Sequence, residues 1–103
     1  MSEDQKIYAI DMQDKAAQML YAHVRFVANV SVSAARKLRV TLYQAIDTLK
    51  KMPLRCPVFR TRNTSDDYRQ LIVGRYQIIF VVDERDSIVH IRYILDSRQR
   101  NDL

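Results

Sequence analysis

A histidine and an arginine two positions apart near the C-terminus are the first candidates for chemistry. His90 and Arg92 belong to the run "SIVHIRYILD", whose alternation of apolar and polar residues indicates a β-strand. Side chains two apart in a strand lie on one face of the sheet, so His90 could serve as a general base while Arg92 binds a phosphate. The alternative is a hydrogen-bonded sheet histidine beside a solvated arginine.

The basic residues of the second half of the chain are all of one type. All five lysines precede Pro53, whereas the nine basic residues after it are arginines: Arg55, Arg60, Arg62, Arg69, Arg75, Arg85, Arg92, Arg98 and Arg100. A guanidinium binds carboxylate or phosphate through paired hydrogen bonds, which indicates a recognition surface. A compositional bias toward arginine is the other interpretation. The net charge of +5 favours an acidic or phosphate-bearing partner.

The C-terminal tail concentrates this feature. Arg98 and Arg100 follow the last apolar run at a spacing of two, with Asp96 and Asp102 on either side. In a locally extended chain both guanidinium groups point the same way, and the carboxylates can hold them by charge pairing. We therefore expect the tail to recognise an acidic or phosphate-bearing surface.

Three strands must position these side chains. The apolar runs predict strands over 68–73, 76–83 and 88–95. The chain's one glycine, Gly74, stands between the first two, where a type II′ turn needs positive φ at its first central residue. The polar segment 83–87 predicts a second, longer turn.

The N-terminal half predicts a strand and two helices. Residues 6–12 suit a short edge strand, and apolar residues recur at helical spacing from Asp14, a candidate cap, to about Asn29. A second helix is expected from an N-cap at Ser31 to Met52, where Pro53 ends it. Residues 53–67 are expected to be irregular. Met12, Met19, Tyr21 and Tyr43 are expected to pack in the interior. The alternative is a partner groove, since apolar helical surface left over after packing on the sheet could bind a partner helix.

These elements predict an α+β fold with a helical hairpin on one face of the sheet. The strand at 76–83 is apolar on both faces, as a central strand should be. In the strand at 88–95, simple alternation gives one face to Val89, Ile91, Tyr93 and Leu95, and the other to Ile88, His90, Arg92 and Ile94. The first face should meet the helices, and the second should be partly open.

Length and composition bound the remaining possibilities. A chain of 103 residues is expected to form one domain over 1–103. No apolar run is long enough to span a membrane, and the polar N-terminus is unlike a signal peptide, so a cytoplasmic protein is expected. Cys56, the single cysteine, should be buried, and its distance in sequence from His23 and His90 gives no metal-ligand spacing. No cofactor or metal is expected.

The segment "YRQLIVGRYQIIFVVDE" and the later "ILDSRQR" resemble the C-terminal half of the RelE/ParE superfamily of toxins from type II toxin–antitoxin systems. The predicted helix over 31–53 and the proline-containing loop after it are similar to the second helix and loop of that family. The resemblance covers nearly the whole chain. It implies a short N-terminal strand and a helical hairpin packed on a twisted, mainly antiparallel sheet completed by three C-terminal strands.

The resemblance also implies a protein that arrests growth, of the kind found in plasmid-stabilisation systems, and that is neutralised by a cognate antitoxin. RelE-like members cut mRNA on the ribosome without a metal ion, and the positions that would carry this activity here are Arg69, His90, Arg92 and Arg98. ParE-like members inhibit DNA gyrase without a reaction of their own. A third reading is a binding module that keeps the fold without toxicity.

Departures from the nuclease pattern favour the gyrase inhibitor. Gln77 and Leu71 stand where RelE-like nucleases carry basic residues, and neither tyrosine nor histidine follows Arg98. The predicted target-binding residues are then Arg75, Arg92, Arg98 and Arg100.

Overall fold

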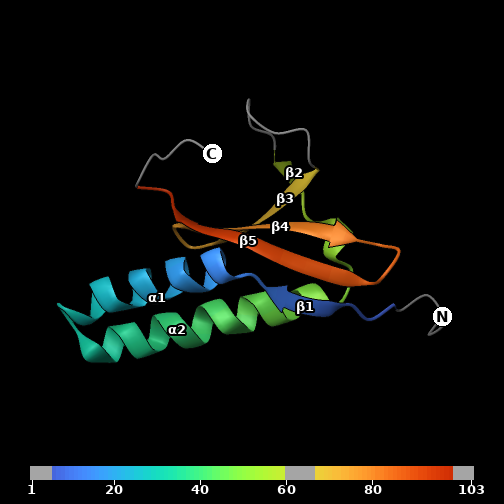
Figure 1. Cartoon of the computed structure of the whole chain (residues 1–103). Coiled ribbons are helices and arrows are strands. Elements are labelled where there is room, and N and C mark those ends of the chain that lie inside the picture. The colour runs from blue at the N-terminus through green and yellow to red at the C-terminus, as the bar shows by residue number, and fades with distance from the viewer. Residues whose placement is uncertain (1–5, 60–66, 99–103) are drawn as a thin grey trace.

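The computed structural model describes residues 6–59 and 67–98, which form a helical hairpin against a five-stranded sheet (Figure 1). The elements are, in chain order, β1 (Ala9–Met12), α1 (Asp14–Ala28), α2 (Val32–Asp47), the 3₁₀ turns η2 (Thr48–Lys50) and η3 (Pro53–Arg55), β2 (Val58–Phe59), β3 (Tyr68–Val73), β4 (Tyr76–Asp83) and β5 (Ile88–Asp96). The predicted α+β class is confirmed.

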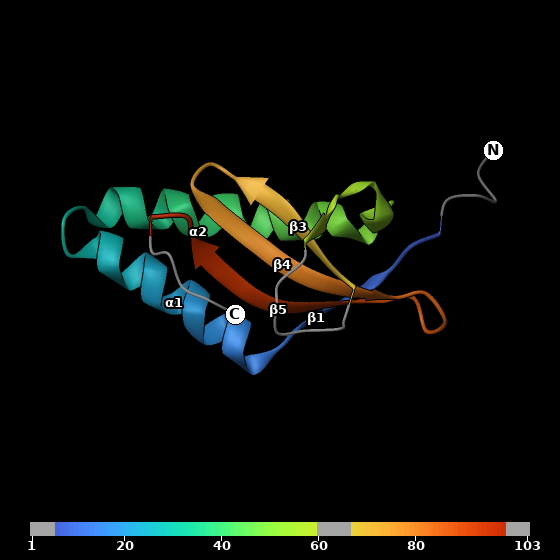
Figure 2. The same ribbon diagram turned by 90° about the horizontal axis from the view of Figure 1, so that it is seen from above.

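The sheet is mixed, with strand order β1-β5-β4-β3-β2. β1 lies at one edge and pairs in parallel with β5, while the other neighbours pair antiparallel. Both helices cover the same face of the sheet, as the two views of the ribbon show (Figures 1 and 2). β1 is therefore the edge strand that the sequence predicted, and its parallel pairing brings the N-terminal segment beside β5.

The Gly74 turn is confirmed. Val73 pairs with Tyr76 across a two-residue loop, and Gly74 has φ of +59°. Arg75, the second central residue, is not among the residues with positive φ, which fits a type II′ turn.

Of the predicted helix ends, those at Ser31 and Asn29 are correct and the cap at Asp14 is wrong. Ser31 caps α2, its Oγ accepting a hydrogen bond of 3.1 Å from the backbone N–H of Ala34. Asp14 is the first residue of α1 rather than its cap, a position that Gln13 holds. Asn29 ends that helix, as expected.

The end of α2 differs from the prediction. The regular α-helix ends at Asp47, and a 3₁₀ turn follows it to Lys50. Met52 then has backbone dihedral angles in the left-handed helical region, which breaks the helical path. Contact with a proline ring disfavours the right-handed helical region for the preceding residue, so Pro53 helps to end the helix through the backbone conformation of Met52. The side chain of Arg55 caps the C-terminal end of this helical segment, since its Nη1 donates to the carbonyl oxygens of Thr48, Lys51 and Met52.

The segment expected to be irregular holds η3 and the two-residue strand β2, which pairs with the start of β3. Two residues are too few to show a strand's alternation. The remainder of that segment up to residue 66 lies outside the described residues.

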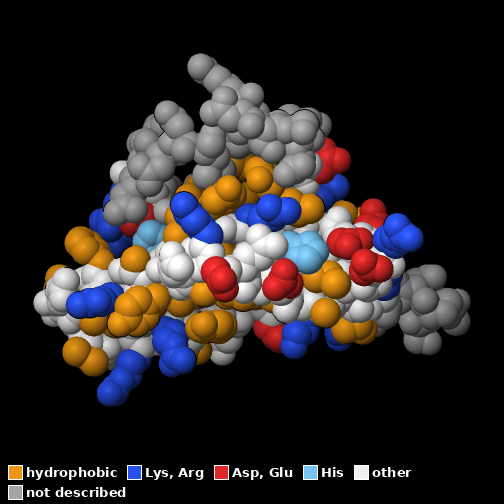
Figure 3. All heavy atoms as spheres, viewed as in Figure 1, with side chains coloured by type: hydrophobic (Ala, Val, Ile, Leu, Met, Phe, Trp, Pro, Cys, Tyr) orange, Lys and Arg blue, Asp and Glu red, His pale blue; other side chains and the backbone are white. Residues whose placement is uncertain are grey.

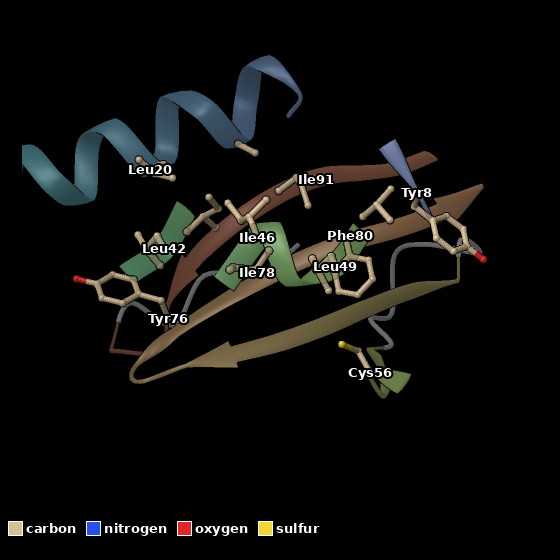
Figure 4. Close-up of a cluster of buried hydrophobic side chains, with 13 residues drawn as sticks. Tyr8, Leu20, Leu42, Ile46, Leu49, Cys56, Tyr76, Ile78, Phe80 and Ile91 are labelled. Carbon is tan, nitrogen blue, oxygen red and sulfur yellow. The ribbon is translucent and has the colours of Figure 1, made fainter. Parts of the chain in front are cut away.

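The core lies between the helices and one face of the sheet (Figure 4). Leu42, Leu49, Ile78, Phe80 and Ile91 are fully buried there. Cys56 is buried at the same layer, as predicted, and burial raises the pKa of its thiol, although the charge of Arg55 opposes the shift.

A β-bulge corrects the predicted faces of β5. Ile79 of β4 pairs with Tyr93 but Phe80 pairs with Ile91, so Arg92 is an extra residue in β5. The bulge reverses the alternation beyond it: Ile94 joins Val89 and Ile91 in the core, whereas Tyr93 and Leu95 lie in a smaller cluster with Tyr68 and Ile79. The assignment of Tyr93, Leu95 and Ile94 from simple alternation was wrong.

Two helical tyrosines also depart from expectation. Met12 and Met19 pack against the core, but Tyr21 and Tyr43 are 63% and 46% exposed. Helical spacing alone predicted burial for both. The two tyrosines are left available on the outer surface of the hairpin.

Candidate functional site

Three charged residues meet where β4 begins and β5 ends. The register pairs Tyr76 with Asp96, so Arg75 in the Gly74 turn lies beside the end of β5. Asp96 Oδ2 lies 3.3 Å from Nη2 of Arg98 and 3.9 Å from Nε of Arg75. We call Arg75, Asp96 and Arg98 the arginine cluster.

Asp96 holds the cluster together although it is only 5% exposed. Burial raises the pKa of its carboxyl, but hydrogen bonds from the backbone N–H and guanidinium of Arg98, with the charges of Arg98 and Arg75, outweigh burial and hold that pKa below its ordinary value. Asp96 therefore stays ionised and orients both arginines, whose side chains remain 42% and 54% exposed.

The tail prediction is correct in one part and wrong in another. Asp96 pairs with Arg98, as expected. The chain is not extended there, however, because β5 ends at Asp96 and the Arg98 N–H bonds back to Asp96 Oδ1 at 2.9 Å in a turn. Arg100 and Asp102 lie outside the described residues.

The arginine cluster rests on α1. The Arg75 guanidinium lies 5.6 Å from the ring centroid of Tyr76, whose ring lies 5.2 Å from that of His23. His23 in turn donates from Nε2 to the carbonyl oxygen of Ile94 at 2.6 Å. A helix side chain thus supports the strand ends that present the arginines.

A second charged group forms at the other end of β5. The parallel register places Asp11 of β1 opposite His90, and Asp11 Oδ2 lies 2.7 Å from His90 Nδ1. This hydrogen bond lowers the pKa of Asp11, with smaller contributions from Gln13 and from the charge of Arg92, against an opposing effect of partial burial. His90 and Arg92 therefore both act on the carboxylate of Asp11, a residue that the sequence pattern did not indicate.

Arg92 carries an unsatisfied donor. Within the two described ranges, its Nε is the one buried side-chain nitrogen or oxygen that lacks a hydrogen-bond partner. A buried N–H without an acceptor is unfavourable by about 1–3 kcal/mol.

Arg69 lies apart from both groups. It pairs with Phe80, a core residue, so it lies on the helix-covered side of the sheet. Its Nη1 donates to the carbonyl oxygens of Cys56 and Leu54, at 2.7 and 3.4 Å. Arg69 thus ties η3 and the residues after it to β3.

The four residues named for a nuclease do not form one site. His90 pairs with Val81 of the smaller cluster, on the sheet face opposite to Arg69. Asp96 lies six positions after His90 along β5, roughly 20 Å at a rise of about 3.3 Å per residue, and Arg98 lies beyond Asp96. Only His90 and Arg92 lie together, while Arg75 and Arg98 lie together elsewhere.

Asp11 was missed because its role depends on a contact between distant segments. The one available signal was a carboxylate within an otherwise apolar edge strand. Among the residues the structure describes, no three His, Cys, Asp or Glu side chains are grouped so as to hold a metal ion. In the same residues, no helix is long and apolar enough to cross a lipid bilayer.

Comparison with known proteins identifies the family. The family model described as "ParE toxin of type II toxin-antitoxin system, parDE" matches residues 10–101. The chain therefore belongs to the ParE toxin family of type II toxin–antitoxin systems. A search of curated proteins found no match.

Solved structures share the fold at low identity. A chain of a chromosomal ParDE system from P. aeruginosa superposes with a TM-score of 0.70 at 17% identity, covering 88% of this chain and 97% of its own. A chain of the RelBE2 toxin–antitoxin complex from Mycobacterium tuberculosis has a TM-score of 0.62 at 18% identity, covering 87% and 91%. A chain of the archaeal RelE–RelB complex from Pyrococcus horikoshii OT3 has a TM-score of 0.59 at 17% identity, covering 92% and 99%.

Proposed function

We propose that this protein is a toxin that arrests growth by binding and inhibiting DNA gyrase, without a reaction of its own. The observation that carries the proposal is the separation of Arg69, His90 and Arg98, because a phosphoryl-transfer site must bring base and charge-stabilising groups to one phosphate. Arg69 is also engaged with two carbonyl oxygens on the covered side of the sheet. Membership of the ParE family supports the same choice.

The arginine cluster is the proposed target-binding site. Asp96 orients Arg75 and Arg98 while leaving their guanidinium groups partly exposed, which suits binding of carboxylate or phosphate on a partner. Arg92, which lies apart from the cluster on the side of His90, and Arg100 are further proposed target contacts.

The proposed regulator is a cognate antitoxin in the same cytoplasm. Three structurally similar proteins were solved as toxin–antitoxin complexes or systems. The net charge of +5 favours an acidic antitoxin segment that orders as it covers the toxin.

The second candidate is the ribosome-dependent endoribonuclease, and the Asp11–His90 pair is the observation that favours it. A carboxylate on Nδ1 fixes the ring tautomer and leaves Nε2 free to accept a proton, with Arg92 adjacent.

Expression of the toxin without antitoxin separates the two candidates. A gyrase inhibitor should induce the DNA-damage response before any message is cut, whereas the nuclease should give cleaved messages without that response. Primer extension on one abundant message and a damage-responsive reporter, measured in the same culture, give both results.

A further inference from the structure

The positive charge of the molecule is concentrated on the helical hairpin. Residues 15–46 contain Lys15, Arg25, Arg36, Lys37 and Arg39 and no acidic residue, so the twelve acidic residues all lie elsewhere and balance the other twelve basic ones. The arginine-rich segment after Pro53 is nearly balanced by its own carboxylates. With Asp14 and Asp47 at its two ends, the hairpin has five basic and two acidic residues, a net charge of +3 out of the chain's +5.

One side of α2 joins this charge to exposed apolar surface. Val32, Val40 and Tyr43 are 59%, 52% and 46% exposed, and with Arg36 they recur at helical spacing on one side of the helix. Ala35, Leu42 and Ile46, on the other side, are buried in the core. We call Val32, Arg36, Arg39, Val40 and Tyr43 the α2 stripe.

The stripe is partly ordered before any partner binds. The Arg39 guanidinium lies 5.7 Å from the ring centroid of Tyr43, and a shallow groove along the helix is lined by Arg39, Val40, Tyr43, Gln44 and Asp47. In Figure 3, hydrophobic and basic side chains interleave over the hairpin end of the molecule. Tyrosine and arginine beside apolar residues are typical of protein–protein contacts.

The charge and shape of the α2 stripe indicate which kind of partner would bind it. A second copy would set like charges against each other, and nucleic acid gains little from exposed valines. A segment that folds on binding usually lies in a groove, whereas this stripe is a convex helix with only a shallow groove. An acidic recess with apolar walls on a folded protein satisfies both the arginines and the valines.

We infer that the α2 stripe docks into an acidic, apolar-walled recess of the protein that the toxin inhibits. This inference rests on the proposed inhibitor function and adds a second contact to the arginine cluster. The Gly74 turn lies at the same end of the molecule as the α1–α2 turn in both ribbon views, and His23 of α1 touches Tyr76. The α2 stripe begins at Val32, next to the α1–α2 turn, so it starts at the end of the molecule that carries the arginine cluster.

The test compares two neighbouring substitutions on α2 in the full chain. Val40→Glu places a negative charge in the stripe, whereas Thr41→Glu places the same charge on an exposed position turned about 100° away around the helix. We expect both variants to keep their melting temperature within a few degrees. Val40→Glu should need about tenfold more toxin for half-maximal growth arrest and for half-inhibition of purified gyrase, a change equivalent to about 1.4 kcal/mol. Thr41→Glu should behave as wild type.

Three outcomes would overturn the inference. The first is equal toxicity of the two variants. The second is a Val40→Glu variant that keeps its toxicity but no longer captures the antitoxin. The third is a Val40→Glu variant that keeps its toxicity but loses either a dimer formed by the wild type or wild-type binding to anionic phosphatidylglycerol vesicles. If wild-type protein leaves gyrase unaffected, the proposed function fails, but the growth-arrest comparison still decides whether the stripe contacts the target.

Discussion

Asp11 and His90 lie 79 positions apart in sequence and face each other across the parallel pair of β1 and β5, with 2.7 Å between Oδ2 and Nδ1. The contact fastens the edge strand to its neighbour. It also has the form of a carboxylate–histidine pair that could move a proton. These two roles predict different mutants.

His90→Gln tests them. In an inhibitor, the pair is structural, so the variant should lose about 0.5–1.5 kcal/mol of stability and keep its toxicity. A nuclease with His90 as its base would lose about two to four orders of magnitude in rate. Urea unfolding and growth arrest, measured on the same variant, separate these outcomes, and Asp11→Asn should reproduce the stability loss.

The arginine cluster predicts loss of toxicity through Arg98. Arg98→Ala combined with Arg100→Ala should abolish growth arrest, and removal of Arg98 should also cost about 1–3 kcal/mol, because Asp96 is then a buried carboxylate without its main partner. Adding Asp96→Asn to the double variant should recover part of the melting temperature without restoring toxicity. Recovery of both would mean that the arginines act only on stability.

Asp96 also predicts sensitivity to acid. Its pKa in the folded protein lies below the ordinary value of 3.8, so the unfolded chain binds a proton more readily. The stability that the ionised carboxylate contributes is complete above about pH 5 and is lost as the pH falls through the ordinary pKa toward the folded one. Urea midpoints between pH 7 and pH 3 should therefore fall more steeply for wild type than for Asp96→Asn, and parallel slopes would contradict the assigned pairing.

Substitutions of Gly74 should lower the free energy of unfolding through backbone strain alone. A Cβ built there meets nothing within 4 Å, but φ of +59° is strained for any other residue and most for a β-branched one. Gly74→Val should lower the free energy of unfolding by about 1–2 kcal/mol and the melting temperature by about 5–10 °C. Gly74→Asn, which tolerates positive φ better, should cost less, and equal losses would mean that side-chain contacts set the effect.

Features set by neighbouring residues could be predicted from the sequence. The turn at Gly74, the cap at Ser31, the three C-terminal strands and the two helices depend on local spacing and backbone preference. The arginine cluster was partly predictable for the same reason, because Asp96 and Arg98 are two residues apart.

Features set by contacts between distant segments could not be predicted from the sequence. The Asp11–His90 pair depends on the parallel docking of β1, and the position of Arg69 depends on carbonyl groups of the loop before β2. The bulge at Arg92 reverses the faces of Tyr93 and Ile94 without any signal in the alternation. Exposure of Tyr21 and Tyr43 likewise depends on how the hairpin sits on the sheet.

The most direct test of the inhibitor function is a supercoiling assay with purified gyrase, relaxed plasmid and the full-length toxin freed from antitoxin, in the absence of ribosomes. We expect supercoiling to fall with increasing toxin, inhibition to persist in His90→Gln, and Arg98→Ala with Arg100→Ala to remove it. A parallel reaction with translating ribosomes should leave the message intact. Full supercoiling at every toxin concentration, together with message cleaved on ribosomes and spared by His90→Gln, would contradict the inhibitor function.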